Sequence, residues 1–282
     1  MSKYHILSLG AGVQSSCLAL MAEHNLVTPK PSFAVFADTQ AEPQAVYDYI
    51  EYLEKQLSYP IYKVTAGNLE DEAITIKKAT DQSKMYKEGE EYSIIQIPVF
   101  GKMPNGKITA AIGRKCTRDY KIRPIQRFIK KQLNINTYLR KNKGVVTTWI
   151  GISTDEVARM KPSHLQWIIH KHPLIDMGMS RQDCIQWLKE NNYKEPVRSA
   201  CYFCPFHGRD DWDYLKTNHP KEFEKAVQFD RELRETSKKY KGRKMEVYLH
   251  KSCKPLNEVD FSENKGQDTF DFLNECEGMC GI

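Results

Sequence analysis

The feature that most constrains the fold is an alternation of short apolar segments with longer amphipathic ones in the first quarter of the chain. Strands are predicted over residues 4–9, 32–37 and 59–64, and helices over residues 15–24 and 43–57. Parallel strands must be joined by a connection that crosses a face of the sheet. This order therefore predicts an α/β fold with a doubly wound parallel sheet.

The rest of the chain extends this pattern. Later predicted elements are a helix over residues 122–133, a strand over 145–152, a helix over 180–191 and a long charged helix over 220–239. Residues 67–113 lack a clear period, and we expect an excursion around a functional site there. We expect one domain over residues 1–195, followed over residues 196–282 by a cysteine-containing helical region that ends in a tail.

Length and composition exclude several classes of protein. A chain of 282 residues with 40% hydrophobic content can bury one substantial core, so we expect neither a disordered nor a fibrous protein. Residues 1–5 lead directly into the first apolar run, without the layout of a signal peptide. No stretch has the roughly 18 to 20 apolar residues of a membrane helix. We therefore expect a cytoplasmic protein that does not bind membranes.

Positive charge is concentrated in one segment. The formal net charge is +6, and residues 114–143 contain eleven Lys or Arg residues but a single acid, Asp119. Such a segment can bind a polyanion, either nucleotide phosphates or a nucleic-acid backbone. A solvated basic helix face is the alternative.

A glycine-rich turn follows the first predicted strand, within the segment Ser8-Leu9-Gly10-Ala11-Gly12-Val13-Gln14-Ser15-Ser16. Glycine at positions 10 and 12 lets the backbone approach phosphate oxygens, and the following helix N-terminus favours an anion. Ser15 and Ser16 can cap the helix or donate hydroxyl groups to phosphate. A Walker P-loop is excluded because no Gly-Lys-Ser/Thr follows, and a dinucleotide fingerprint lacks its third glycine. The turn alone could also be structural.

Two further segments follow predicted strands in the same way. Asp38 and Thr39 end the second strand, where ligands bind in parallel α/β sheets, although helix capping is the alternative for such a pair. The segment Gly151-Ile152-Ser153-Thr154-Asp155-Glu156-Val157-Ala158-Arg159 follows the strand over residues 145–152. Its carboxylates could orient magnesium or an ammonium group, and its arginine could neutralise a leaving phosphate group.

These three segments resemble the PP-loop superfamily of ATP pyrophosphatases and PAPS-reductase-like enzymes, also described as adenine nucleotide alpha hydrolase-like. They are similar, in order, to its Ser-Gly-Gly-x-Asp-Ser, Asp-Thr-Gly-x-x-x-Pro and Gly-Ile-x-x-x-Glu-x-x-Arg patterns. Gln14 stands at the Asp position of the first pattern, and a neutral amide cannot hold magnesium as a carboxylate does.

The resemblance implies a Rossmann-like fold of the HUP or PP-loop type that binds ATP and Mg²⁺ in residues 1–195. The implied catalytic residues are Asp38, Asp155, Glu156, Arg159 and Cys280. The implied nucleotide-binding residues are Ser8, Gly10, Ala11, Gly12, Gln14, Ser15, Ser16, Asp38, Thr39 and Arg114.

Eight cysteines in a chain without an expected export signal favour reduced thiols, a metal or cluster site, or redox chemistry. Cys116 lies among cations, which favour its thiolate, and Cys201 and Cys204 have a spacing that lets both reach one metal. This arrangement is similar to cluster-carrying PP-loop enzymes, which implies a [4Fe–4S] cluster on these three residues. The implied fourth ligand is Cys253, Cys276 or Cys280. Zinc, a redox dithiol or a pair of core cysteines are the alternatives.

Three functions are consistent with the sequence. The first is ATP-dependent adenylation of a substrate with release of pyrophosphate, in sulfur transfer to a nucleic acid or nucleotide. The second is a sulfonucleotide reductase, acting on APS or PAPS through Cys276 or Cys280. The third is a nucleotide-binding sensor that contains zinc. The expected partners are an adenine nucleotide and either a nucleic-acid substrate or a sulfur-donor protein, and a homodimer is left open.

Overall fold

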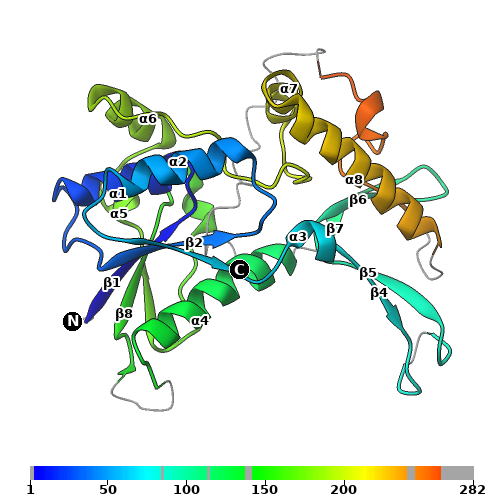
Figure 1. Ribbon diagram of the computed structural model, residues 1–282, viewed down its shortest axis with the longest axis horizontal. Coiled ribbons are helices and arrows are strands. Elements are labelled where there is room, and N and C mark those ends of the chain that lie inside the picture. Colours follow the sequence, from blue (N-terminus) through cyan, green and yellow to red (C-terminus); the bar gives the residue numbers. More distant parts are fainter. Residues whose placement is uncertain (1–2, 84–85, 113–114, 137–141, 240–244, 262–282) are drawn as a thin grey trace. The chain divides into compact units, whose positions relative to one another are not determined.

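A computed structural model describes residues 3–83, 86–112, 115–136, 142–239 and 245–261 (Figure 1). These residues form two compact units. Unit 1 comprises the described residues within 3–66 and 117–200, and unit 2 those within 67–116 and 201–261. The segment expected to be an excursion thus clusters with the cysteine-bearing region. The two units are described separately below.

Unit 1 is built on a five-stranded sheet in which every neighbouring pair of strands is parallel. Its strands are β1 (Tyr4–Leu9), β2 (Phe33–Asp38), β3 (Ile61–Thr65), β8 (Val146–Ile150) and β9 (Ile168–Lys171). Their spatial order is β3-β2-β1-β8-β9. The chain therefore builds outward from β1 in one direction and then crosses to its other side, which confirms the predicted doubly wound parallel sheet.

Helices cover both faces of this sheet. One face packs against α1 (Val13–Glu23), α2 (Gln44–Glu54), α5 (Pro173–Asp176) and α6 (Arg181–Glu190). The other face packs against α4 (Arg123–Gln132), as Figure 1 shows. Successive residues of a strand point to opposite faces of the sheet. In β1, Leu7 therefore packs in the core under α1, and Ile6 packs in the core under α4.

Helix α1 is the most enclosed of these helices. All ten residues from Val13 to Ala22 are buried, because α1 lies between the sheet and α6. Its apolar side chains therefore surround the helix instead of forming one stripe. Cys17 and Cys184 meet in this core, each with 0% of its surface exposed, so the prediction that both are core residues is confirmed.

Unit 2 combines small antiparallel sheets with helices. It contains α3 (Leu69–Glu72), the hairpin β4 (Ile74–Lys78) and β5 (Glu91–Ile95), and a second sheet of β6 (Val99–Lys102), β7 (Ile108–Ile112) and β10 (Glu246–Tyr248), in the order β10-β6-β7. Its longer helices are α7 (Arg209–Asn218) and α8 (Pro220–Lys239). Within the described residues, no helix combines the length and apolar character needed to cross a membrane.

Replacing Ile129 of α4 with alanine tests the packing of this helix on the sheet. The side chain is completely buried, so its truncation is expected to lower the free energy of unfolding by about 2–4 kcal/mol. Lys131→Ala on the exposed side of the same helix is the control, with an expected change within about 0.5 kcal/mol. Urea unfolding followed by circular dichroism measures both variants, and equal effects would contradict this packing.

Candidate functional site

The three sequence motifs of unit 1 follow neighbouring strands. Gly10–Ser16 follows β1, Thr39 follows β2, and the segment 151–159 follows β8. Because β1 pairs in parallel with both β2 and β8, the carboxyl ends of these strands share one edge of the sheet. The direction of winding reverses between β1 and β8, and ligands of open α/β sheets bind at such a switch point. The fold therefore brings the predicted loops together.

The turn after β1 is closed by its own hydrogen bonds. The Gly10 N–H donates to Ser15 Oγ at 3.2 Å, and this hydroxyl lies 3.4 Å from the Gly12 carbonyl oxygen. Ala11 has φ of 61°, so the left-handed residue of the turn is the alanine between the two glycines. Gly12 caps α1 in extended backbone geometry. Ser15 therefore shapes the turn; the sequence offered either a capping role or donation to phosphate for this hydroxyl.

Gly151 lies directly against the first turn of α1. A Cβ atom at this position would stand 2.7 Å from the Ser15 backbone nitrogen and 2.8 Å from its Cα. These are backbone atoms, which cannot move aside as a flexible side chain can. Only glycine lets the loop after β8 approach the start of α1 so closely.

A polar network connects the same two loops. Gln14 Nε2 donates to Ser153 Oγ at 3.4 Å and to Glu156 Oε2 at 3.3 Å. The other oxygen of Glu156 accepts a hydrogen bond from Arg159, so the carboxylate is held by an amide and a guanidinium. All four side chains are buried. Gln14 Oε1 has no hydrogen-bond partner among the described residues, which leaves a buried acceptor at the start of α1.

Asp38 closes the turn after β2. Its Oδ1 accepts hydrogen bonds from the Gln40 N–H and the Tyr47 hydroxyl, both at 2.8 Å. Burial and this hydrogen bond raise the pKa of Tyr47, which stays protonated as a donor. Both bonds end on Oδ1, and Oδ2 accepts no hydrogen bond from the described residues. Thr39 beside it is completely buried.

Asp155 has a positioning role in the structure. Its Oδ1 accepts a hydrogen bond from the Arg181 N–H at 3.0 Å, at the start of α6. The neighbouring Thr154 N–H donates to the Met179 carbonyl oxygen at 2.9 Å. Asp155 thus fixes the loop after β8 to the next helix, and Glu156, not Asp155, faces α1.

A buried ion pair in unit 1 was not found by sequence reasoning. Lys121 Nζ lies 3.4 Å from Glu42 Oε1, and the two side chains expose only 9% and 1% of their surface. Ser199 Oγ donates to the other Glu42 oxygen at 3.5 Å. Glu42 lies in the loop that follows Asp38 and Thr39, so this pair ties the loop to the segment before α4. The signal in the sequence was one cation within a strongly basic stretch, which does not distinguish a buried residue from an exposed one.

The predicted cluster ligands lie in unit 2. Cys201 is buried and Cys204 is partly exposed, and the Cys204 N–H donates to the Cys201 carbonyl oxygen at 2.8 Å in a tight turn. Cys116 is partly exposed, and its N–H donates to the Gln96 carbonyl oxygen at 3.0 Å. Cys253 is buried, which raises the pKa of its thiol. Arg114, Cys276 and Cys280 lie outside the described residues.

The described part of the chain contains no group of three or more His, Cys, Asp or Glu side chains that could hold a metal ion. For magnesium this still permits a site, because Mg²⁺ is commonly held by one or two carboxylates together with substrate phosphates. Asp38 Oδ2 is suited to that role. For an iron–sulfur cluster the described residues do not supply a ligand set, so no chemical step is assigned to one.

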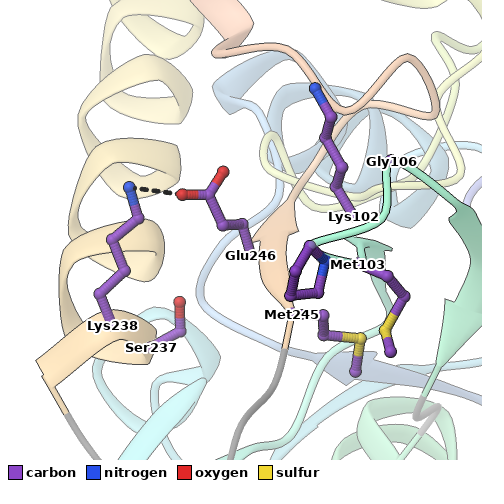
Figure 2. A pocket seen from close by; sticks show the side chains of 8 residues that line it. Lys102, Met103, Gly106, Ser237, Lys238, Met245 and Glu246 are labelled. Atoms are coloured by element: carbon purple, nitrogen blue, oxygen red, sulfur yellow. Dashed lines mark ion pairs between the residues drawn. The ribbon is translucent and has the colours of Figure 1, made fainter.

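A cavity of about 470 Å³ lies in unit 2 between β6, the end of α8 and β10. Figure 2 shows Met103 and Met245 on one side and the ion pair between Lys238 and Glu246, at 2.8 Å, on the other. Lys238 and the Tyr248 hydroxyl hold the pKa of Glu246 below its usual value. The lining contains no candidate catalytic group that the sequence singled out.

Comparison with known proteins adds no relative: no protein-family model matches the chain, and no curated protein matches it.

Replacing Gly151 with alanine tests the close approach of the two loops. The added methyl group would overlap the backbone of Ser15, so the free energy of unfolding is expected to fall by about 1–3 kcal/mol. Thermal and urea unfolding measure the effect. A variant as stable as the wild type would show that the loops do not touch.

Replacing Gln14 with glutamate tests the polar network. A second carboxylate would face Glu156 with Arg159 as the nearest cation, so stability at pH 7 is expected to fall by about 1–3 kcal/mol. Protonation of either carboxyl group removes the repulsion, so this loss should shrink as the pH falls toward about 4. Gln14→Met, which removes the amide without adding charge, should show no such recovery in urea unfolding. Identical pH profiles of the two variants would contradict the network.

Proposed function

We propose that the chain binds ATP at the glycine turn after β1 and transfers its adenylyl group to a substrate with release of pyrophosphate. The observation that carries the proposal is the meeting of Gly10–Ser16 and the loop 151–159 at the switch point between β1 and β8. These loops come from two of the three segments that resemble PP-loop enzymes. In such a sheet a nucleotide has its natural binding place at this edge.

The phosphates are expected at the first turn of α1. Its N–H groups and helix dipole favour an anion, and α1 is held rigidly by Gly151 and the surrounding core. Glu156 and Arg159 neutralise each other, so the positive potential at this place comes chiefly from the helix N-terminus. Asp38 Oδ2 lies at the end of the neighbouring strand and accepts no hydrogen bond among the described residues, which supports a contact with the ribose or a magnesium ion.

The proposed reaction forms one bond at the α-phosphorus and breaks another. An oxygen nucleophile of the substrate attacks the α-phosphorus, the bond to the bridging oxygen of the β-phosphate breaks, and pyrophosphate leaves with that bonding pair. The donors of the α1 N-terminus stabilise charge that develops on the phosphates. When bound, Mg²⁺ supplies further charge neutralisation. A sulfur nucleophile can then attack the carbon that bears the activated oxygen. A carbon–sulfur bond forms, the carbon–oxygen bond breaks and AMP leaves with that oxygen, which is the thiolation expected from the resemblance.

A nucleotide sensor without turnover is the second candidate. Two observations favour it. Gln14 stands where the PP-loop pattern has an aspartate, and the Glu156 carboxylate is already bound by Gln14 and Arg159. Such a protein binds ATP at the same place and produces no pyrophosphate. The reductase alternative depends on Cys276 or Cys280, which lie outside the described residues.

Replacing Gly12 with leucine tests the nucleotide site. Gly12 is buried and has backbone angles open to any residue, so in a folded variant a leucine side chain competes with the phosphates for the space at the start of α1, and ATP affinity is expected to fall by at least about tenfold. Isothermal titration calorimetry with ATP and Mg²⁺ measures affinity, and a pyrophosphate assay distinguishes enzyme from sensor.

The control for this variant is Lys55→Leu, at the exposed C-terminal end of α2. It should bind ATP as the wild type does. Unchanged ATP affinity in a folded Gly12→Leu protein, judged by circular dichroism, would refute the proposed site.

A further inference from the structure

A basic groove runs along α4 in unit 1, outside the proposed nucleotide site. Two adjoining cavities form it, and both are lined by Arg123, Gln126, His164 and Leu165. Arg118 and His170 line one end, and Arg127 and Lys130 the other. The groove therefore lies between α4 and the segment 163–167 that precedes β9.

The charge of this groove is strongly positive. Asp119 pairs with both Arg118, at 3.0 Å, and Arg123, at 2.6 Å, so one acid is shared between two exposed cations. Arg127 and Lys130 are exposed and make no ion pair within the part of the chain that the structure describes. A ligand with several negative charges along its length is therefore attracted to the whole groove.

A second and independent feature is a buried acceptor at one end of the groove. His170 Nδ1 lies 2.9 Å from the Lys161 carbonyl oxygen, which can only accept, so Nδ1 carries the proton. Burial lowers the pKa of His170 and keeps its ring neutral, which leaves Nε2 with a lone pair. Nε2 is buried and has no hydrogen-bond partner among the described residues. His170 lines the groove, so this unsatisfied acceptor becomes available to an O–H or N–H group of a ligand when the atoms that cover it are displaced.

We propose that this groove binds a single strand of nucleic acid, which is the substrate or part of the substrate of the enzyme. Binding of the strand does not depend on the proposed function; only its role as the substrate does. Phosphates of the strand contact Arg127 and Lys130 and, at the other end, Arg118 and Arg123. A sugar hydroxyl or base amine donates to His170 Nε2, and Gln126 offers its amide to base edges.

An acidic protein fits the groove less well. Protein interfaces depend on a few apolar or aromatic anchors that become completely buried. The apolar side chains here are Leu165 and Ile122, while Trp167 is already 94% covered and has little surface to offer. Cations interleaved with amide and imidazole groups can instead contact phosphates and base edges.

The test measures binding of a fluorescent single-stranded oligonucleotide of roughly 15 nucleotides, as RNA and as DNA, to the full chain by fluorescence anisotropy. The double variant Arg127→Ala with Lys130→Ala is expected to bind about tenfold more weakly, with a salt dependence reduced by roughly 1.4 in the slope of log K against log salt concentration. The control removes two exposed lysines, Lys55 and Lys189, from the side covered by α2 and α6, and should bind within about twofold of the wild type.

His170→Phe tests the buried acceptor. It removes Nε2 together with the Nδ1 donor to the Lys161 carbonyl oxygen, so the fold of the variant is checked by circular dichroism, and the affinity of the folded protein is expected to fall roughly fivefold with an unchanged salt slope. Wild-type affinity in a folded double variant overturns the proposal. Equal binding of a polyglutamate peptide that depends on Arg127 and Lys130 also overturns it, in favour of an acidic protein.

ATP binding is measured in parallel on the same proteins. The double variant should bind ATP as the wild type does, because neither residue lies in the loops after β1, β2 or β8. If the wild type binds the oligonucleotide through Arg127 and Lys130 but does not bind ATP, the proposed function is wrong, while the proposal that the groove binds nucleic acid is supported. If the wild type binds ATP but not the oligonucleotide, only the proposal of nucleic-acid binding in the groove is contradicted.

Discussion

The account depends on the contact between the loop after β8 and the start of α1. Gly151 brings backbone against backbone at this point, and Gln14, Ser153, Glu156 and Arg159 form a buried polar network beside it. A buried carboxylate is costly unless it is paired and hydrogen-bonded, so this network is stable only when every member is in place. The first turn of α1 is therefore fixed in position before any ligand arrives, which is what an anion site built from backbone N–H groups requires.

This network also explains an amide at position 14. Glu156 already provides the negative charge between the two loops, and Arg159 balances it. A carboxylate at position 14 would add a second negative charge next to the first, whereas the amide donates to Glu156 and to Ser153. Under the proposed function, chemistry at the phosphates depends on the helix N-terminus and on charge that arrives with the nucleotide. Because the Gln14 amide is neutral and Glu156 is paired with Arg159, a nucleotide sensor is the second candidate for this site.

The sequence predicted four of the five strands of the parallel sheet and the helices α1, α2, α4 and α6, because these elements have clear periods. It missed β9 and α5, which are only four residues long each. It could not predict partners distant in sequence, such as Gln14 and Glu156, which are 142 residues apart. Nor could it show that Asp155 fixes α6, or that Ala11 takes the left-handed position between two glycines. The small sheets of unit 2 were missed because their strands are short, and β10 joins β6 from the far end of the chain.

Hydrogen–deuterium exchange with and without ATP and Mg²⁺ tests the central claim most directly, because it reports on every loop of the native chain at once. The account predicts slower exchange on nucleotide binding in peptides that cover residues 10–16, 38–40 and 151–159, the ends of three adjacent parallel strands. Protection confined to unit 2, with these three loops unchanged, would contradict it.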